Sequence, residues 1–532
     1  MLCVVLAGCG DRAALRDAAE NAEDTRAYRI EWYAGSVESA FELARSQGTP
    51  VLFHWCADWC PPCSTLKTTV FNRREFIERT RLFVPVRVDG DETGAQKLGE
   101  RLEVVGYPTT IVFSPDGQEI TRVPLGLDLT RHVKALNIAL EAIRPVAAAY
   151  DAALNGAATS ADYRLLAYYS WAQDHEKLVS KEQLPNALRH LHGRIPEELA
   201  VERALLFGHY LNAYMSVVSE NEVNPTLPAE ERPAAQQRML EVLQDPALAA
   251  AVQNDIMYGA CWLLPMIAQP DDVGRTDLER AWEAAIERIR NDPETSPADR
   301  VGTYLGEICL ASVRQPEKSL PASLVREARG AVLTAARDTV DPHPRLALFG
   351  SASLVLAAVG TTGQIWGYVL DEVEDSHAPD YVMSVLAALF ESMDADEEAS
   401  EGKSHTADVA LDWRQRAWKA ATGPATRFGL GTRYVRSLLS LAPHRSRPIE
   451  RITVKVFREL RGEPDAFFHS VTDSMERLET ALHEWNADGV HNDSMATIRA
   501  EVLKVCATIP AGNQSRTNCE AFLASHDGDA AP

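Results

Sequence analysis

The spacing of apolar residues along the chain changes once, near residue 145. Before that point, short runs rich in β-branched and aromatic residues predict strands, beginning with the buried run Val51–Phe53 and continuing with 82–88, 110–113 and 119–123. Segments with helical spacing lie between and around them, at 36–46, from Cys60 to about residue 70, at 95–102 and at 130–143. This part of the chain is therefore expected to be an α/β unit.

From Pro145 onward, no convincing strand is visible. More than ten segments of about 12–20 residues show helical periodicity, separated by Pro, Asp and Gly. In 276–290, for example, Leu278, Trp282 and Ile289 share one face. The apolar run 346–359 is too short and too broken to span a membrane, which indicates a buried helix. Residues 146–532 are thus predicted to be all helical, as an α-solenoid of paired helices or as an irregular bundle.

The composition is that of a soluble globular protein. The chain has 532 residues, enough for about two to four domains, and 46% of them are hydrophobic. Its net charge of −23 argues against nucleic acid as a partner. Residues 29–145 contain 14 Lys and Arg against 15 Asp and Glu, so nearly all of the net negative charge lies outside this part.

The sequence WCADWCPPC, at residues 55–63, lies between the first predicted strand and a predicted helix. Cys60 and Cys63 are close enough in the chain to form a disulfide within one helical turn. The unpaired N–H groups and partial positive charge of a helix N-terminus favour a thiolate at Cys60. Cys60 is therefore the predicted nucleophile and Cys63 the resolving thiol, and the mechanism requires an ionised and exposed Cys60. Half of a zinc site is the alternative, but no second pair of ligands at matching spacing is visible.

Several motifs together resemble the thioredoxin family, over residues 29–143. They are ADWCPPC at 57–63, TVF at 69–71, VVGYPT at 104–109 and IVFSPDG at 111–117, and they are most similar to the C-terminal periplasmic domain of the disulfide-reductant transporter DsbD. The order of strands and helices predicted above is the one that this resemblance requires. The resemblance implies a thioredoxin fold over residues 29–145.

The resemblance also implies a groove for the substrate. In this family the proline at the position of Pro108 is cis and lies beside the disulfide, and the backbone of the preceding residue pairs with an extended substrate. An X-Pro bond can be cis, which fits this assignment. Trp59, Tyr107 and Pro108 are accordingly expected to bind the substrate.

Two positions near the cysteine pair depart from the family. His54 stands where thioredoxins usually bury a carboxylate, six residues before the nucleophile, and Lys67 stands where DsbD-type domains tend to carry an acid. Because both changes replace an acid, we expect them to favour the thiolate. Asp58, two residues before Cys60, is the third residue expected to tune the ionisation of the pair. The alternatives are a buried His54 hydrogen-bonded to backbone and a solvated Lys67.

The N-terminus resembles a bacterial lipoprotein signal. Residues 6–9, with the sequence LAGC, match a lipobox, in which a lipid is attached to Cys9. Residues 1–9 are then the signal, and 10–28 form a tether that holds the protein to a membrane surface on the periplasmic side of the cell envelope. Gly10 favours the outer membrane. No basic region precedes the short apolar run, so a cytosolic protein with an apolar N-terminus is the alternative.

The remaining cysteines fall into three groups. Cys506 and Cys519 are predicted to form a structural disulfide between the last two helices. Cys261 and Cys309 lie on apolar helix faces and are expected to be buried free thiols. Cys56 is expected to be a small core residue, with a regulatory pairing as the alternative.

Two functions fit these residues. The first is a membrane-tethered periplasmic thiol–disulfide oxidoreductase that reduces protein disulfides through the Cys60–Cys63 dithiol, without a further cofactor, and receives electrons from an upstream thiol–disulfide donor. The second is a helical scaffold or adaptor lipoprotein whose thioredoxin-like domain only docks. The intact cysteine pair favours the first, because a docking module has no use for it. The histidines lack the spacing of metal ligands, as in His190, His192, His209 and His377.

Overall fold

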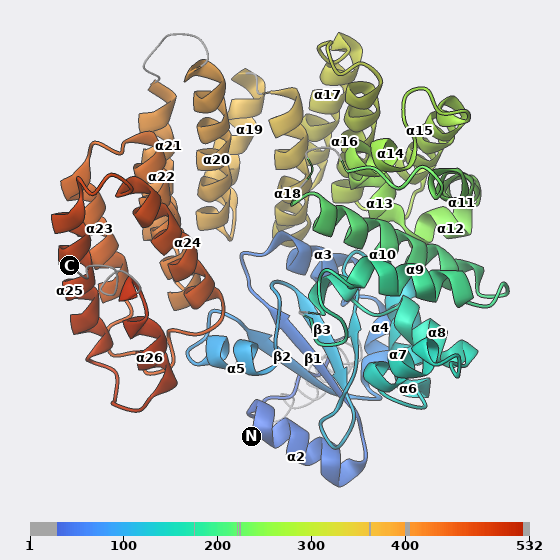
Figure 1. The fold of residues 1–532 in the computed structure, drawn as a ribbon, viewed down its shortest axis with the longest axis horizontal. Coiled ribbons are helices and arrows are strands. Elements are labelled where there is room, and N and C mark those ends of the chain that lie inside the picture. Colours follow the sequence, from blue (N-terminus) through green and yellow to red (C-terminus); the bar gives the residue numbers. More distant parts are fainter. Residues whose placement is uncertain are drawn as a thin grey trace, which may run out of the picture.

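The computed structural model describes residues 29–524, apart from residues 175, 221, 223–224, 361–362 and 399–404. The predicted signal, Cys9 and the tether lie outside the described residues. Figure 1 shows a small sheet with its own helices and a long arc of further helices that curves over it.

A four-stranded sheet forms the centre of the first region. Its strands are β1 (Val51–Cys56), β2 (Val84–Asp89), β3 (Thr109–Phe113) and β4 (Glu119–Val123), in the spatial order β2-β1-β3-β4. β1 runs parallel to β2 and antiparallel to β3, and β4 is antiparallel to β3. All six residues of β1 are buried, as suits a central strand.

Five helices surround this sheet in the described residues: α2 (Val37–Gln47), α3 (Pro61–Thr69), α4 (Arg74–Thr80), α5 (Ala95–Arg101) and α6 (Leu129–Glu141). Ser36 caps α2 through its hydroxyl, which accepts the Ser39 N–H. The predicted elements are all present, so the α/β thioredoxin fold is confirmed. α4 is an additional helix that was not predicted from the sequence.

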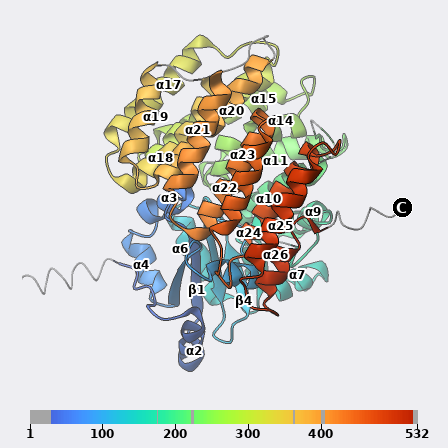
Figure 2. The same ribbon diagram turned by 90° about the vertical axis from the view of Figure 1, so that its left-hand side faces the viewer.

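The described chain after β4 is helical, which confirms the large all-α region. Many of these helices pack on the next helix or the next but one, and in Figure 2 several of the later ones lie side by side in a row. The helices are α7 (Val146–Leu154), α8 (Ser160–Ala167), the 3₁₀ helix η1 (Trp171–Gln173), α9 (Leu184–Arg194), α10 (Ala200–Val218), α11 (Arg232–Gln244), α12 (Pro246–Ala251), α13 (Gln253–Tyr258), α14 (Ala260–Ile267), α15 (Arg275–Asn291), α16 (Pro297–Arg314), α17 (Ala322–Asp338), α18 (Pro342–Val359), α19 (Gly363–Asp375), α20 (Pro379–Glu398), α21 (His405–Ala420), α22 (Pro424–Leu441), α23 (Ser446–Arg458), α24 (Ser470–Trp485), α25 (Asn492–Cys506) and α26 (Gln514–Glu520).

One hydrophobic core runs through both regions. Leu52, Val112 and Leu136 of the thioredoxin-like region belong to the same buried cluster as Leu188 of α9 and Trp282 of α15. The boundary near residue 145 is therefore a change of secondary structure and not a break in packing. Within the described residues, no helix is both long and apolar enough to cross a bilayer.

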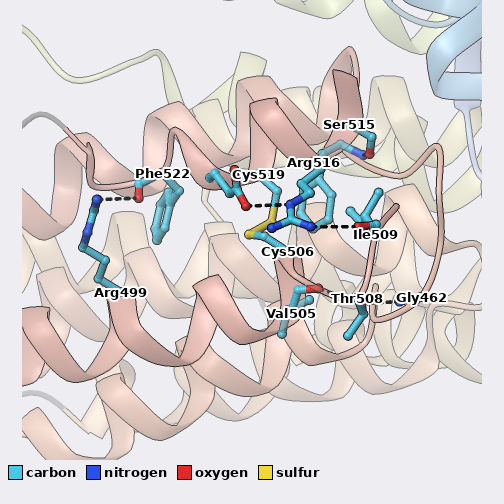
Figure 3. Close-up of a disulfide and its surroundings, with 12 residues drawn as sticks. Gly462, Arg499, Val505, Cys506, Thr508, Ile509, Ser515, Arg516, Cys519 and Phe522 are labelled. Atoms are coloured by element: carbon cyan, nitrogen blue, oxygen red, sulfur yellow. Dashed lines mark hydrogen bonds and ion pairs between the residues drawn. A yellow bond between two sulfur atoms is a disulfide. The ribbon is translucent and has the colours of Figure 1, made fainter. Parts of the chain in front are cut away.

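Two disulfides join helices of the helical region. Cys506 and Cys519 link α25 to α26, as predicted, with their Cα atoms 5.6 Å apart (Figure 3). Cys261 of α14 and Cys309 of α16 form the other, at a Cα–Cα distance of 4.6 Å, so the prediction that they are free thiols is wrong. An apolar helix face indicates that a cysteine is buried, but it does not show that two helices 48 residues apart along the chain meet.

Candidate active site

The predicted nucleophile and resolving thiol lie where β1 ends and α3 begins. Cys60 is the N-cap of α3, with extended backbone (φ −82°, ψ 116°), and its sulfur accepts the backbone N–H of Cys63 at 3.3 Å. Pro61 lies at the start of the helix, where its missing N–H leaves no hydrogen bond unmade. Both cysteines are free thiols, so the structure holds the dithiol form of the pair.

The ionisation of Cys63 suits the role of the resolving thiol. Burial raises the pKa of the Cys63 thiol far above its usual value, and the hydrogen bond and charge of Cys60 act in the same direction. The backbone N–H of Ala57 and the charge of Lys67 oppose this shift only in part. Cys63 is therefore protonated at neutral pH, until it attacks a mixed disulfide formed at Cys60.

The helical region covers the cysteine pair. Cys60 is 2% and Cys63 1% exposed, so the expectation of an exposed nucleophile is wrong for this conformation. α18 packs along α3, and Gly350 lies so close to Pro61 that a Cβ at position 350 would be 3.0 Å from the Cβ of Pro61. This packing could not be predicted from the sequence, because it joins segments that lie far apart in the chain.

The residues predicted to bind the substrate lie around the pair. The Tyr107–Pro108 peptide bond is cis, as the resemblance implies. The side chains of Tyr107 and Trp59 pack against the buried cysteines, with their rings edge to face at 5.3 Å. The carbonyl of Pro108 accepts a hydrogen bond from Gln173 of η1 at 3.1 Å. The helical region thus also contacts the loop in which a substrate is expected to bind.

Trp59 joins the two regions. Its indole N–H donates to Asp91 at 2.9 Å, and its ring lies nearly parallel to that of Tyr381 in α20, with centroids 6.5 Å apart. Asp91 also accepts hydrogen bonds from the backbone N–H and the hydroxyl of Thr426, at 2.9 and 2.6 Å, and so caps α22 from outside that helix. Gly423 permits this approach, because a Cβ there would lie 2.4 Å from the Cβ of Asp91.

A second external cap lies beside Tyr107. Gln96 of α5 accepts hydrogen bonds from the N–H and the hydroxyl of Ser470, at the start of α24, at 3.1 and 2.6 Å. Its amide nitrogen donates to the Tyr107 hydroxyl at 3.3 Å. Asp91 and Gln96 therefore dock two helix N-termini beside the active site. No sequence signal marks these two residues, since their partners lie 335 and 374 positions away.

Asp58 and Lys67 form an ion-pair network at the edge of the site. Asp58 accepts hydrogen bonds from Lys67 and from Arg87, both at 3.0 Å. Burial alone would raise the pKa of Asp58, but the hydrogen bonds and charges of Lys67 and Arg87 hold it below its usual value. Arg87 also donates its Nε–H to the sulfur of Cys56 at 3.0 Å. The one sequence signal for Arg87 is a charged residue within an otherwise largely apolar strand.

His54 and Cys56 are buried in β1. The Nδ1 atom of His54 is 2.9 Å from the Thr110 hydroxyl, and its ring packs edge to face against Phe71, so its partner is a side chain and not backbone. Burial lowers the pKa of His54 to about 3, and the charge of Arg87 adds to this effect, so the ring is neutral at pH 7. His54 can therefore affect the cysteine pair only as a neutral group. Burial raises the pKa of Cys56 to about 11, as expected of a core residue.

The scattered histidines lie in the helical region, and His377 is exposed there. His192 and His209 each hydrogen-bond to a backbone carbonyl, and burial lowers the pKa of both to about 4. The ring of His377 contacts that of His343. No three His, Cys, Asp or Glu side chains of the described residues are grouped so that they could hold a metal ion.

The fold and the cysteine pair together define a thioredoxin-like domain with a Cys-X-X-Cys site. Residues 37–137 match the protein family described as thioredoxin-like domain. The chain is similar to the thiol:disulfide interchange protein DsbD of Pseudomonas fluorescens, with 33% identity over 85 residues, and to DsbD of Klebsiella pneumoniae, with 30% identity over 79 residues. These matches cover 16% and 14% of this chain and only 15% and 13% of the relatives.

The solved structure called DsbH oxidoreductase is 20% identical, and the alignment covers 22% of this chain and 87% of that one, with a TM-score of 0.20. The sequence matches therefore show a thioredoxin-like domain that is distantly similar to part of DsbD.

Proposed function

We propose that the protein is a thiol–disulfide oxidoreductase that reduces disulfides in other proteins. The observation that carries this proposal is the free Cys60–Cys63 pair at the start of α3, with the Cys60 sulfur bonded to the Cys63 N–H. The similarity to DsbD, whose name describes thiol:disulfide interchange, supports it.

The proposal places the protein on the periplasmic side of the cell envelope, held at the outer membrane by a lipid on Cys9. The lipobox at residues 6–9 is the basis for this location. The two disulfides of the helical region support it, because such bonds persist in oxidising compartments.

In the proposed reaction, the thiolate of Cys60 attacks one sulfur of a substrate disulfide, and the other substrate sulfur leaves as a thiolate. Cys63 then attacks the Cys60 sulfur of this mixed disulfide, its proton passes to a released substrate sulfur, and the second substrate thiol departs. The substrate gains two electrons, and the pair is left as a Cys60–Cys63 disulfide. An upstream dithiol donor restores the dithiol by the reverse exchange.

The burial of Cys60 favours a second candidate, a helical scaffold or adaptor in which the thioredoxin-like domain only docks. A disulfide reduction assay with insulin as the substrate separates the two functions. The oxidoreductase proposal predicts turnover by the wild type and only the uncatalysed rate with Cys60→Ser. Equal rates for the two proteins would leave the scaffold as the function of the chain.

A further inference from the structure

Three helices of the arc approach the thioredoxin-like region with their N-terminal ends. α20 places Tyr381 against Trp59, α22 is capped by Asp91, and α24 is capped by Gln96. α22 packs against α24, and the three helices lie near one another on the same arm of the arc in Figure 1. Beyond these N-terminal ends, the three helices therefore run away from the cysteine pair.

Two turns above these ends, the helices carry arginines. Arg433 follows Thr426 by seven residues in α22, and Arg477 follows Ser470 by seven residues in α24, so each lies on the face of its helix that begins at the active site. Seven residues of α-helix rise about 10 Å. Arg436, one turn further along α22, continues the same face. We call these three side chains the arginine face.

The arginine face lacks a carboxylate of its own. Arg433, Arg436 and Arg477 are exposed, and no ion pair links any of them to an acid within the described residues. Arg433 donates to the uncharged hydroxyl of Ser384 in α20 at 3.2 Å. Although the Arg433 side chain reaches solvent, its neighbours keep water from part of the guanidinium, and this desolvation, followed by the positive charges of Arg414, Arg436 and Arg477, lowers its pKa.

The acid that acts on Arg433 already has other partners. Glu391 of α20 acts on Arg433, but it accepts two hydrogen bonds from Arg414 and one from the Ser437 hydroxyl. The uncompensated positive charge is unusual in a chain with a net charge of −23, most of which lies outside residues 29–145. Mutually repelling cations of this kind are stabilised when an anion binds to them.

Tyr381 connects the arginine face to the nucleophile. Burial raises the pKa of Tyr381 to about 12, a negative charge at Cys60 acts in the same direction, and the charge of Arg433 opposes it. The Tyr381 ring is therefore within electrostatic reach of both the sulfur and the guanidinium. An anion on the arginine face would lie about 10 Å along the helices from the ends that meet the active site.

We infer that the arginine face docks an acidic segment of the polypeptide substrate, next to the cysteine that Cys60 attacks. This inference rests on the proposed function and names its substrate class. An extended chain advances about 3.3 Å per residue, so acidic residues about three positions from the substrate cysteine would span the rise of about 10 Å to the arginines. Because the cysteines are buried and α18 packs on the helix that carries them, an extended segment fits the site better than a folded surface.

The test uses the full chain and two synthetic peptides, each with one cysteine in a mixed disulfide with a neutral thiol. One peptide carries glutamates about three to five positions from the cysteine, a reach set by the extended-chain spacing, and the other carries glutamines there. The value of kcat/KM is measured for the wild type, for the double variant Arg433→Gln and Arg477→Gln, and for Arg326→Gln. Arg326 is a matched control, because it is exposed on α17 and bonds only weakly to its own helix.

The wild type should prefer the acidic peptide, and about 0.5 M salt should weaken that preference. In the double variant, the ratio of kcat/KM for the acidic peptide to that for the neutral peptide should fall about tenfold, as expected when electrostatic steering is removed. In Arg326→Gln this ratio should stay as in the wild type. Equal rates for the two peptides, or a preference that survives in the double variant, would overturn the inference. The inference would also be overturned if the double variant reduced the small anionic disulfide dithiobis-nitrobenzoate more slowly than the wild type but reduced both peptides at the wild-type rates. The arginines would then bind a small anion and not a peptide segment.

A binding measurement separates this inference from the proposed function. The acidic peptide is labelled with a dye, its cysteine is replaced by serine, and its binding is followed by fluorescence anisotropy. Binding that depends on Arg433 and Arg477, without reduction of either peptide, would leave the docking face standing and contradict the oxidoreductase. Reduction of both peptides at one rate, abolished by Cys60→Ser, would leave the oxidoreductase standing and contradict the docking face.

Discussion

Gly350 of α18 lies against Pro61 of α3, the residue that follows the nucleophile, with too little space between them for a side chain. This contact closes the helical region over the start of the active-site helix, where Cys60 is 2% exposed. For a disulfide to reach Cys60, the groups packed around it must move, and these include Trp59, Tyr107 and the elements that hold them. The cover therefore controls access to the thiol in the proposed reaction.

A larger side chain at position 350 should loosen this cover. Gly350→Leu places carbon atoms where Pro61 now lies, so α18 is expected to shift away from α3. The rate of alkylation of Cys60 by iodoacetamide, followed by mass spectrometry, should rise severalfold. Gly330→Leu on α17 is the control, because a Cβ at position 330 meets no atom within 4 Å. Equal alkylation rates in the two variants would show that α18 does not limit access.

Asp91 should stabilise the docking of the helical region. Asp91→Ala leaves three donors without their acceptor, namely the Trp59 indole and the N–H and hydroxyl of Thr426, and removes the cap of α22. The free energy of unfolding in urea is expected to fall by about 1–3 kcal/mol. Thr426→Ala should cost much less in the Asp91→Ala background than in the wild type, because the partner is already missing. Fully additive effects would mean that the two residues do not act together.

Local features could be predicted from the sequence because their causes are local. The apolar run of β1, the cysteine spacing and the X-Pro bond of Tyr107–Pro108 each lie within one short segment. The Cys506–Cys519 disulfide was predictable for the same reason, since its cysteines are 13 residues apart.

The helical cover could not be predicted in this way. It depends on pairs such as Asp91 with Thr426, 335 positions apart, and helical periodicity shows which face of a helix is buried but not against which partner. The Cys261–Cys309 disulfide escaped prediction for this reason. The neutral state of His54 also depends on its burial beside Thr110, which is 56 positions away.

The burial of neutral His54 should lower the free energy of unfolding in acid. Burial lowers its pKa to about 3 in the folded protein, whereas an unfolded chain has a value of about 6.5. Between these values the unfolded state binds the extra proton, so the free energy of unfolding falls as the pH falls from about 6.5. At about pH 5 the loss from this one residue is on the order of 2 kcal/mol.

Two variants isolate this effect from other titrating groups. Urea unfolding of His54→Gln should decline less between pH 7 and pH 5 than that of the wild type. His444→Gln, which changes an exposed histidine, should follow the wild-type curve. The prediction fails when His54→Gln and the wild type lose the same stability over this range.

The two disulfides should differ in their contribution to stability. Cys261 and Cys309 are 48 residues apart, whereas Cys506 and Cys519 are 13 apart. A longer closed loop restricts the unfolded chain more, so removing the first pair with alanines should cost about 1 kcal/mol more than removing the second. Thermal or urea unfolding of the two double variants measures this difference. The reverse order would show that native packing, and not chain entropy, determines the contribution of each bond.

The central claim is that Cys60 attacks disulfides and Cys63 releases what Cys60 has captured. Its most direct test is to express Cys63→Ala in cells and to look for proteins attached to Cys60 by a disulfide that dithiothreitol cleaves. The account predicts such mixed disulfides with Cys63→Ala, fewer with the wild type, and none when Cys60→Ser is added. The absence of any adduct with Cys63→Ala, or adducts that persist in the absence of Cys60, would contradict it.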